Sequence, residues 1–464
     1  MRLSPISKME NADQVRIETT RRWVVLALTG TATFLLAFQA GAIIVCLPAI
    51  SKQLGATFLA ADCIVAYSLT LTALLLTAGH LVDLYGYQTL YAVGAVLFAF
   101  GSILGGVATG VHALIGARVL QGIAAAMLTA TCPAMIANSV PKARLTEILG
   151  FQSAMTYLGV ALGPMGGGYL GAWFGWRSLF ILNVPVALLA VGLLVTSSKQ
   201  ILGSGRPQLR TNALCSIWPF AVGLLLVAAI KHDWVWHLRF VPGLALAAVF
   251  LILFFTIDRR NPVTLRLGVE LLHERNVWSS NVNEILHYSI LYAVAFLLPT
   301  FLISLLHQRM EFVGLAIAVQ PMARAVVALL AGKVSSMFGV QWTVVIGAAV
   351  AAFSLAGFCQ LSEHTPTRFL LLCLGVLGVG TGLLVPSNAS NLLASLPSER
   401  RGLVSGMLGT SRNLGMAIGF GAASSIYSSG VAALNAASPG GDACLLYTSP
   451  SPRDRTRSRM PSSA

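Results

Sequence analysis

The amino-acid sequence predicts an all-α polytopic membrane protein with two pseudo-symmetric six-helix bundles and two inserted helices. Three observations support this fold class: the composition, the recurrence of apolar segments and an internal repeat. Of the 464 residues, 56% are hydrophobic and 10% are charged, with a mean hydropathy of +0.78. Soluble domains carry about 25% charged residues. The composition therefore excludes an ordinary soluble protein.

Apolar segments of membrane-spanning length recur thirteen times along the chain, because a helix needs about 17 to 25 residues to cross a bilayer. They are 23–47, 61–82, 90–109, 113–137, 148–170, 179–195, 213–230, 241–257, 277–303, 313–330, 342–361, 369–389 and 403–427. The connections are too short for a soluble catalytic or nucleotide-binding domain, and the phosphate-loop pattern is absent. We therefore expect neither an enzyme nor an ATP-driven pump, and no cofactor or metal.

Two nonapeptides at the ends of the second and tenth segments match in pattern, AGHLVDLYG at 78–86 and AGKVSSMFG at 331–339. Such repetition is typical of transporters built from two related halves. We therefore expect the following domains: a cytoplasmic tail at 1–22, a six-helix bundle at 23–197, a linker with two inserted helices at 198–276, and a second, incomplete bundle at 277–443.

The distribution of lysine and arginine predicts the orientation. With alternating segments, seventeen basic residues fall on the side of the N-terminus and six on the other side. Cytoplasmic loops carry the excess of basic residues. We therefore expect a multi-pass protein of the plasma (cytoplasmic) membrane, surrounded by lipid, with a cytoplasmic N-terminus.

The last 21 residues, 444–464, read CLLYTSPSPRDRTRSRMPSSA, which is what translation through a sequencing adapter would produce. We expect this segment to be an artefact, and the fold to be truncated after thirteen of fourteen helices. A genuine basic tail is the alternative. The sequence makes no prediction of oligomeric state.

The segment 159–185 combines closely spaced glycines with a proline. Gly159, Gly163 and Gly167 recur every four residues, so they share a helix face that a neighbouring backbone can approach closely. Pro164 frees a backbone carbonyl, which predicts a helix break and an interior position.

With the WFGWRSLFILNVP that follows, this segment resembles the fifth helix and loop of drug:proton antiporters of the major facilitator superfamily, in the fourteen-helix branch. The resemblance implies that Gly163 and Pro164 act in gating.

The first nonapeptide resembles a loop signature of the same family on Gly79, Leu81, Asp83 and Gly86. There the acidic residue caps and pairs at a cytoplasmic gate, so Gly79, Asp83 and Gly86 are candidate gating residues. The basic residues usual after Gly86 are missing, which implies a weaker or differently made gate. Asp83 as a solvated loop residue is the alternative.

Candidate proton-coupling residues lie in two segments. Arg118 begins an R-x-x-Q-G pattern that resembles a family signature tied to proton movement. Glu284 is the acidic residue clearly inside an apolar segment, and His287 lies three residues on, on the same helix face. The alternatives are a structural strut for Arg118 and an interfacial, snorkelling carboxylate for Glu284.

Candidate substrate-binding residues are polar groups within apolar segments: Gln39, Tyr157, Gln320 and Asn388. Gln39 stands where the resembling family commonly has an aspartate, and glutamine cannot titrate. Hydrogen bonds between helices are the alternative role for the other three.

The sequence therefore predicts a secondary transporter that exports amphiphilic drugs or metabolites by alternating access, with protons as the coupling ion and no nucleic-acid partner. Gln39 favours an alternative, a proton-independent facilitator or an importer of a small organic solute. A non-transporting membrane sensor or scaffold is a third reading, from another class.

Overall fold

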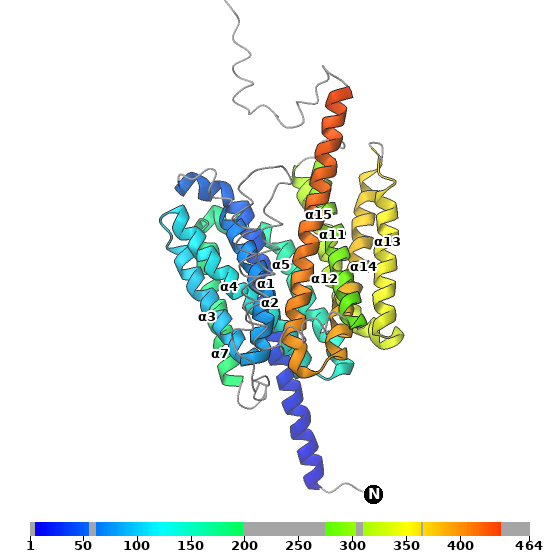
Figure 1. Cartoon of the computed structure of the whole chain (residues 1–464). Helices are drawn as coiled ribbons and strands as arrows, with labels where there is room; N and C mark the ends of the chain where they lie inside the picture. Colours follow the sequence, from blue (N-terminus) through cyan, green and yellow to red (C-terminus); the bar gives the residue numbers. More distant parts are fainter. Residues whose placement is uncertain (1–4, 55–61, 198–273, 303–309, 363–364, 438–464) are drawn as a thin grey trace, which may run out of the picture.

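The computed structural model describes residues 5–54, 62–197, 274–302, 310–362 and 365–437, and they form helices joined by short loops (Figure 1). No strand occurs in this part of the chain. The fold class is therefore confirmed as all-α. The expected segments 213–230 and 241–257 and the suspected artefact at 444–464 lie outside the described residues.

The first group of helices comes from the N-terminal half of the chain. It consists of α1 (Pro5–Leu54), α2 (Asp62–Tyr85), α3 (Tyr87–Gly106), α4 (Val111–Ser139), α5 (Leu145–Phe174), the short α6 (Ser178–Ile181) and α7 (Asn183–Ser197). The expected N-terminal tail is helical from Pro5 and continues without interruption into the first apolar segment, so α1 protrudes beyond the other helices (Figure 1).

The second group comes from the C-terminal half. It consists of α11 (Arg275–Thr300), α12 (Met310–Phe338), α13 (Val340–Phe358), α14 (Thr367–Ser395) and α15 (Arg401–Ala437). In Figure 1, α3, α4 and α7 lie on the left and α13 and α14 on the right, with α5, α12 and α15 between them. Helices α5 and α2 of the first group pack against α12 and α15 of the second.

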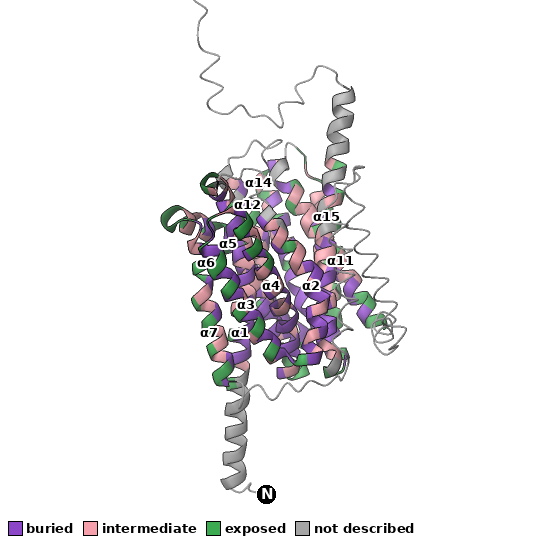
Figure 2. Ribbon diagram, turned by 60° about the vertical axis from the view of Figure 1, so that its left-hand side comes forward, coloured by how far each residue is buried: buried purple, intermediate pink, exposed green. Residues whose placement is uncertain are grey.

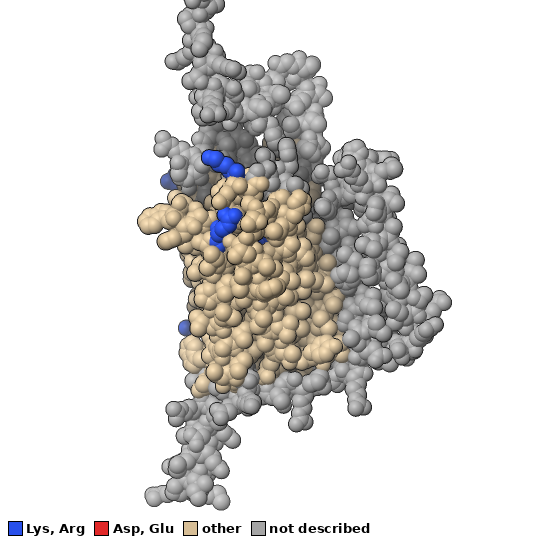
Figure 3. Space-filling model, turned by 90° about the vertical axis from the view of Figure 1, so that its left-hand side faces the viewer, with Lys and Arg blue, Asp and Glu red and all other residues tan. Residues whose placement is uncertain are grey.

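Nine helices of the described part are long and apolar enough to cross a membrane. Most of the described surface seen in Figure 3 carries no charged side chain, and the basic ones lie mostly toward the top. An uncharged lateral surface is what a lipid environment requires. The chain is therefore a multi-pass membrane protein.

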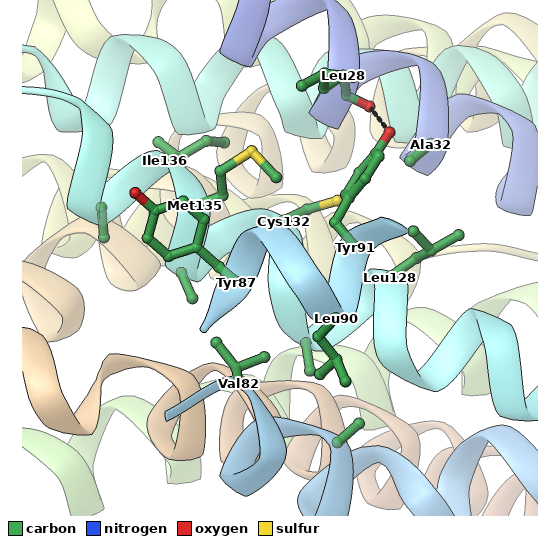
Figure 4. Close-up of a cluster of buried hydrophobic side chains, with 14 of the residues drawn as sticks. Leu28, Ala32, Val82, Tyr87, Leu90, Tyr91, Leu128, Cys132, Met135 and Ile136 are labelled. Carbon is green, nitrogen blue, oxygen red and sulfur yellow. Dashed lines mark hydrogen bonds between the residues drawn. The ribbon is translucent and has the colours of Figure 1, made fainter. Parts of the chain in front are cut away.

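The largest buried apolar cluster is centred on the first group and extends into the second, where Leu392 of α14 and Val404 of α15 belong to it. Leu28 of α1, Tyr91 of α3 and Met135 of α4 are each fully or almost fully buried in it (Figure 4). The Tyr91 hydroxyl donates a hydrogen bond of 2.8 Å to the carbonyl oxygen of Leu28. Figure 2 shows buried residues concentrated on α2 and α4, in the interior of the molecule.

The internal repeat is visible in the backbone. Gly86 follows α2 and caps α3 with φ 84° and ψ 148°, and Gly339 follows α12 and caps α13 with φ 83° and ψ 152°. Residues with a side chain rarely adopt this conformation, so glycine is needed at both turns. The two nonapeptides therefore end on the same turn.

Alternating helices place one set of helix ends on the side from which α1 enters. We call this the N-terminal face and define it by Tyr85, Ser139, Leu145, Phe338, Ser395 and Arg401. Both nonapeptides end here. The other side is called the opposite face.

One expectation is wrong: Pro164 does not break its helix. Helix α5 runs from Leu145 to Phe174 with Pro164 inside it. Helices α4, α12 and α14 likewise continue through Pro133, Pro321 and Pro386. Membrane helices tolerate proline because neighbouring groups satisfy the freed carbonyl.

Candidate functional site

On the N-terminal face, Asp83 joins the two groups of helices. Its two carboxylate oxygens accept hydrogen bonds of 2.7 Å from the backbone N–H groups of Gly402 and Leu403. These are among the first N–H groups of α15, which have no partner inside the helix and carry its positive dipole. The alternative of a solvated loop residue is therefore wrong, because Asp83 caps a helix of the other group.

Two further contacts hold the same corner. A Cβ atom at Gly79 would lie 2.6 Å from the carbonyl oxygen of Gly402, so α2 and α15 approach as closely as two backbones can. The Nη1 atom of Arg401 donates to the carbonyl oxygen of Ala137 at 2.6 Å and to Oδ1 of Asn138 at 3.0 Å, at the end of α4. Gly79 and Asp83 are thus brought together, whereas Gly86 shapes the following turn.

The second nonapeptide makes the equivalent approach between α12 and α5. A Cβ atom at Gly332 would lie 2.5 Å from Cα of Glu147. Ser336 occupies the place that corresponds to Asp83, and its hydroxyl donates to the carbonyl oxygen of Lys333 within its own helix. Nearby, Thr146 Oγ1 donates to Ser390 Oγ at 2.7 Å, which joins α5 to α14. The α2–α15 and α12–α5 contacts are thus alike in the close approach of their backbones, but only the first has a carboxylate that caps the neighbouring helix.

The glycine face of α5 packs against α1 inside the first group. Cβ atoms at Gly159, Gly163 and Gly167 would lie 2.5–2.6 Å from the carbonyl oxygens of residues 34, 38 and 42. The expected close approach of a neighbouring backbone is confirmed. Gly163 is therefore buried between two helices of one group, and not at the contact between the groups. Pro164 contacts Gly41 of α1 but is exposed, so the interior position expected for the proline is not found.

A network of amides crosses the interior of the first group. The Nδ2 atom of Asn183 donates to Oε1 of Gln39 at 2.6 Å, and Nε2 of Gln39 donates to Oε1 of Gln121 at 3.2 Å. Gln121 donates in turn to the hydroxyl of Ser102 at 2.8 Å. We call Gln39, Ser102, Arg118, Gln121 and Asn183 the amide network. All are buried, and none carries a carboxylate.

Arg118 is the charged member of the amide network. Its Nη1 donates to Oε1 of Gln121 at 2.8 Å and its Nε to the carbonyl oxygen of Cys63 at 3.2 Å. Its guanidinium carbon lies 4.1 Å from the ring centroid of Tyr67. A buried charge needs such partners. The partners of Arg118 are two uncharged oxygen atoms and the ring of Tyr67.

A second cluster of buried charges lies in the other group. Glu284 of α11 is fully buried, and its nearest basic atom is Nη2 of Arg412 in α15, at 4.0 Å. Neither carboxylate oxygen of Glu284 accepts a hydrogen bond of ordinary geometry among the described residues. The alternative of a snorkelling interfacial carboxylate is therefore wrong, since the side chain lies inside the protein.

Arg324 of α12 completes this cluster. Its Nη2 donates to Nε2 of His287 at 3.0 Å and to the Tyr288 hydroxyl at 3.4 Å. Its guanidinium carbon lies 4.0 Å from the ring centroid of Tyr157, which comes from α5 of the first group. We call Tyr157, Glu284, His287, Tyr288, Arg324 and Arg412 the central cluster. It lies where the two groups of helices meet, and its members are buried except Arg412, whose side chain is 30% exposed.

Of the predicted substrate-binding residues, Asn388 lies near the central cluster and Gln320 lies apart from it. Asn388 of α14 faces Glu284, and its Nδ2 donates to the carbonyl oxygen of Ser280 at 3.0 Å. Gln320 of α12 donates to the hydroxyl of Thr381 at 3.4 Å, a contact within the second group. Gln39 belongs to the amide network, and Tyr157 belongs to the central cluster. The four predicted substrate-binding residues therefore do not form one site.

The sequence marks Arg324 and Arg412 as further buried basic residues without assigning them a role, and it does not single out Gln121 and Asn183 for the site. Both arginines stand inside apolar segments, which was the available signal, since charges there are costly and rarely without a role. Nothing in the spacing indicates that Asn183 and Gln39, which are 144 positions apart, form a hydrogen bond.

Two related groups of membrane helices that enclose buried charges and meet at one face define a membrane transporter. A family model described as the Major Facilitator Superfamily matches residues 29–258 and 282–440. The chain belongs to this superfamily, whose members transport small molecules and are not enzymes.

Individual relatives agree with this assignment. The riboflavin transporter RibZ of Clostridioides difficile is 27% identical over 86% of this chain and 87% of its own length. The multidrug resistance protein Stp of Mycobacterium tuberculosis is 27% identical over 87% of this chain and 75% of its own length. The structure of the proton:xylose symporter XylE aligns with a TM-score of 0.61 at 15% identity, over 90% of this chain and 91% of that one, which shows the shared fold.

Proposed function

We propose that this transporter exports amphiphilic small molecules by alternating access. The observation that carries the proposal is the central cluster: Tyr157 of the first group covers Arg324 of the second, so relative movement of the groups uncovers or covers a charged site. The relative named as a multidrug resistance protein supports export as the direction.

The proposed moving units are the bundles 23–197 and 277–443, joined by the linker 198–276. The N-terminal face is the cytoplasmic side of the plasma membrane in this proposal, in keeping with its excess of basic residues. The contact of Asp83 with Gly402 and Leu403 then closes the cytoplasmic side in the conformation described here. A substrate enters from the cytoplasm when this contact separates.

Proton coupling through Glu284 is part of the proposal. Among the described residues this is the carboxylate that is fully buried, and Arg412 at 4.0 Å is its basic partner. Gaining or losing a proton changes the net charge of the central cluster by one, which changes the free energy of separating the two groups of helices.

The test uses cells that express the full chain and are preloaded with riboflavin, fluorescein or the cationic xanthene dye pyronin Y. We expect faster efflux of at least one dye than from cells without the protein, and slower efflux when an ionophore collapses the pH gradient. Glu284→Gln should remove the response to the ionophore, because glutamine cannot exchange a proton.

Glu274→Gln is the matched control, since Glu274 is exposed at the start of the same helix. Efflux equal to that of cells without the protein, for all three dyes, contradicts export. Efflux that ignores the pH gradient in the unchanged protein contradicts proton coupling alone.

The amide network favours a second candidate, proton-independent facilitation. Gln39, Gln121 and Asn183 fill the interior of the first group with groups that do not titrate in the physiological range. In that case an imposed substrate gradient drives flux in either direction, and the ionophore has no effect. The dye experiment therefore separates the two candidates.

A further inference from the structure

The central cluster carries more positive than negative charge. Arg324 and Arg412 face a single carboxylate, Glu284, and the amide network adds Arg118 without any acid. A site that selects organic cations needs a surplus of carboxylates, since opposite charges attract strongly where water is excluded. The described part of this interior instead has more arginines than carboxylates.

Arg324 is the arginine that lacks an acidic partner within the cluster. Arg324 is 3% exposed, and it forms no ion pair with any of the described residues. Its Nη2 donates to His287 and Tyr288, but its buried Nε–H has no acceptor within the part of the chain that the structure describes. A buried donor without an acceptor costs free energy, and more so on a charged group. The guanidinium therefore has a positive charge and an N–H donor that an anion could pair with.

The surroundings of Arg324 restrict how an anion can reach it. The ring of Tyr157 lies 4.0 Å from the guanidinium carbon and the ring of Tyr288 lies 5.4 Å from it. Aromatic rings that approach a guanidinium take up its apolar faces, which leaves the edge that carries the N–H groups. A planar carboxylate or a sulfonate matches this edge with two parallel hydrogen bonds.

Access to this edge depends on the contact between the two groups of helices. Tyr157 belongs to α5, while Arg324 belongs to α12. The same two helices touch closer to the N-terminal face, where a Cβ atom at Gly150 would collide with the carbonyl oxygen of Ala328. Separation of α5 from α12 on this face withdraws Tyr157 and exposes Arg324 to the cytoplasmic side.

We propose that the transported substrates are organic anions whose carboxylate or sulfonate binds Arg324 when α5 and α12 separate. The inference rests on the proposed export function and names its substrate class. Glu284 and Arg412 keep their pairing in this scheme, because of the two arginines in the central cluster it is Arg324 that lacks an acidic partner.

The test measures binding separately from export, with two dyes that share a xanthene ring system and differ in charge. Fluorescein is an anion at neutral pH and pyronin Y is a cation. Binding to the purified full-length protein is followed by fluorescence anisotropy. We expect fluorescein to bind at least about tenfold more tightly than pyronin Y, as charge-assisted hydrogen bonds to a buried arginine allow.

Variants assign the preference to Arg324. Arg324→Gln should weaken fluorescein binding by about tenfold or more and leave pyronin Y binding unchanged or stronger. Arg324→Lys keeps the positive charge but cannot form two parallel hydrogen bonds, so it should give an intermediate loss of fluorescein affinity. Arg368→Gln, at an exposed arginine near the start of α14, should match the unchanged protein. Size-exclusion profiles and thermal unfolding of each variant report whether it is folded.

The outcomes distinguish this inference from the export function. Equal binding of both dyes, tighter binding of pyronin Y, binding of neither dye, or an equal loss of both dyes in folded Arg324→Gln overturns the anion preference. Fluorescein binding that depends on Arg324, without efflux from cells, supports the anion site and contradicts export. Efflux of pyronin Y without fluorescein binding supports export and overturns the inference.

Discussion

At the scale of single residues, Gln39 holds a place that an amide fills and an ionised carboxylate cannot. It accepts a hydrogen bond from Asn183 and donates one to Gln121. A carboxylate only accepts once it has lost its proton. The glutamine is therefore matched to its neighbours, and the aspartate common in resembling transporters would need different ones.

We predict that Gln39→Glu makes stability depend on pH. The protonated side chain keeps a donor for Gln121, whereas the ionised one places a negative charge against the Gln121 carbonyl oxygen. The loss of a buried hydrogen bond costs about 1–3 kcal/mol. The free energy of unfolding of Gln39→Glu should therefore be highest at low pH and fall as the pH rises and the new carboxyl group loses its proton. Thermal unfolding at pH values of about 4 and 8 measures this, because the first lies just below the ordinary glutamate pKa of about 4.3 and the second lies well above it.

Gln39→Met is the control, because methionine has a similar length and loses both hydrogen bonds at every pH. It should be less stable than the unchanged protein by the same amount at both pH values. A Gln39→Glu protein whose unfolding temperature tracks that of the unchanged protein across the range would show that the amide network accepts a carboxylate.

At the scale of helices, the spacing of glycines on α5 sets how closely α1 approaches. A Cβ atom at Gly163 would lie 2.6 Å from the carbonyl oxygen of Phe38, and the nearest atom to a Cβ at Gly168 would be 3.9 Å away. The first distance demands a shift of the helix, because the obstacle is backbone. The second is an ordinary van der Waals contact.

We predict that Gly163→Ala destabilises the protein and Gly168→Ala does not. Overpacking of this kind costs about 1–3 kcal/mol, while alanine at the roomy site should be neutral or slightly stabilising. The measurement is the thermal unfolding temperature of each purified variant. Equal unfolding temperatures for the two variants would mean that α1 and α5 are not packed as closely as described.

At the scale of the whole molecule, the two groups of helices are held together on the N-terminal face. Asp83 caps α15, Arg401 binds the end of α4, and Thr146 bonds to Ser390 of α14. The alternating access that we propose requires these contacts to separate in each cycle. A covalent link across this face should therefore stop transport.

We predict that Thr146→Cys with Ser390→Cys forms a disulfide, since the two hydroxyl oxygens are 2.7 Å apart. Oxidation should abolish dye efflux and a reducing agent should restore it. Each single variant, treated in the same way, is the control. Full efflux from protein shown by mass spectrometry to be cross-linked would contradict a cycle that opens this face.

Much of the architecture could be predicted from the chain, and the site only in part. The apolar segments and the two nonapeptides predicted the helices and the equivalence of the turns at Gly86 and Gly339. Glu284 and Arg118 were predicted as functional groups because charges are costly in a membrane. Arg324 could be recognised as a buried basic residue but not given a role, because its partners come from α11 and α5, at distances along the chain that no periodic pattern records.

By itself the sequence determined that this protein lies in a membrane as a series of helices and that its halves are related, because hydrophobicity and local repetition are properties of neighbouring residues. The tertiary structure alone decided that Asp83 caps α15, that Gln39 belongs to an amide network and that Tyr157 covers Arg324. Each of these contacts joins residues far apart in the chain. Their pairing follows from how helices pack against one another, which requires all of the packing faces at once.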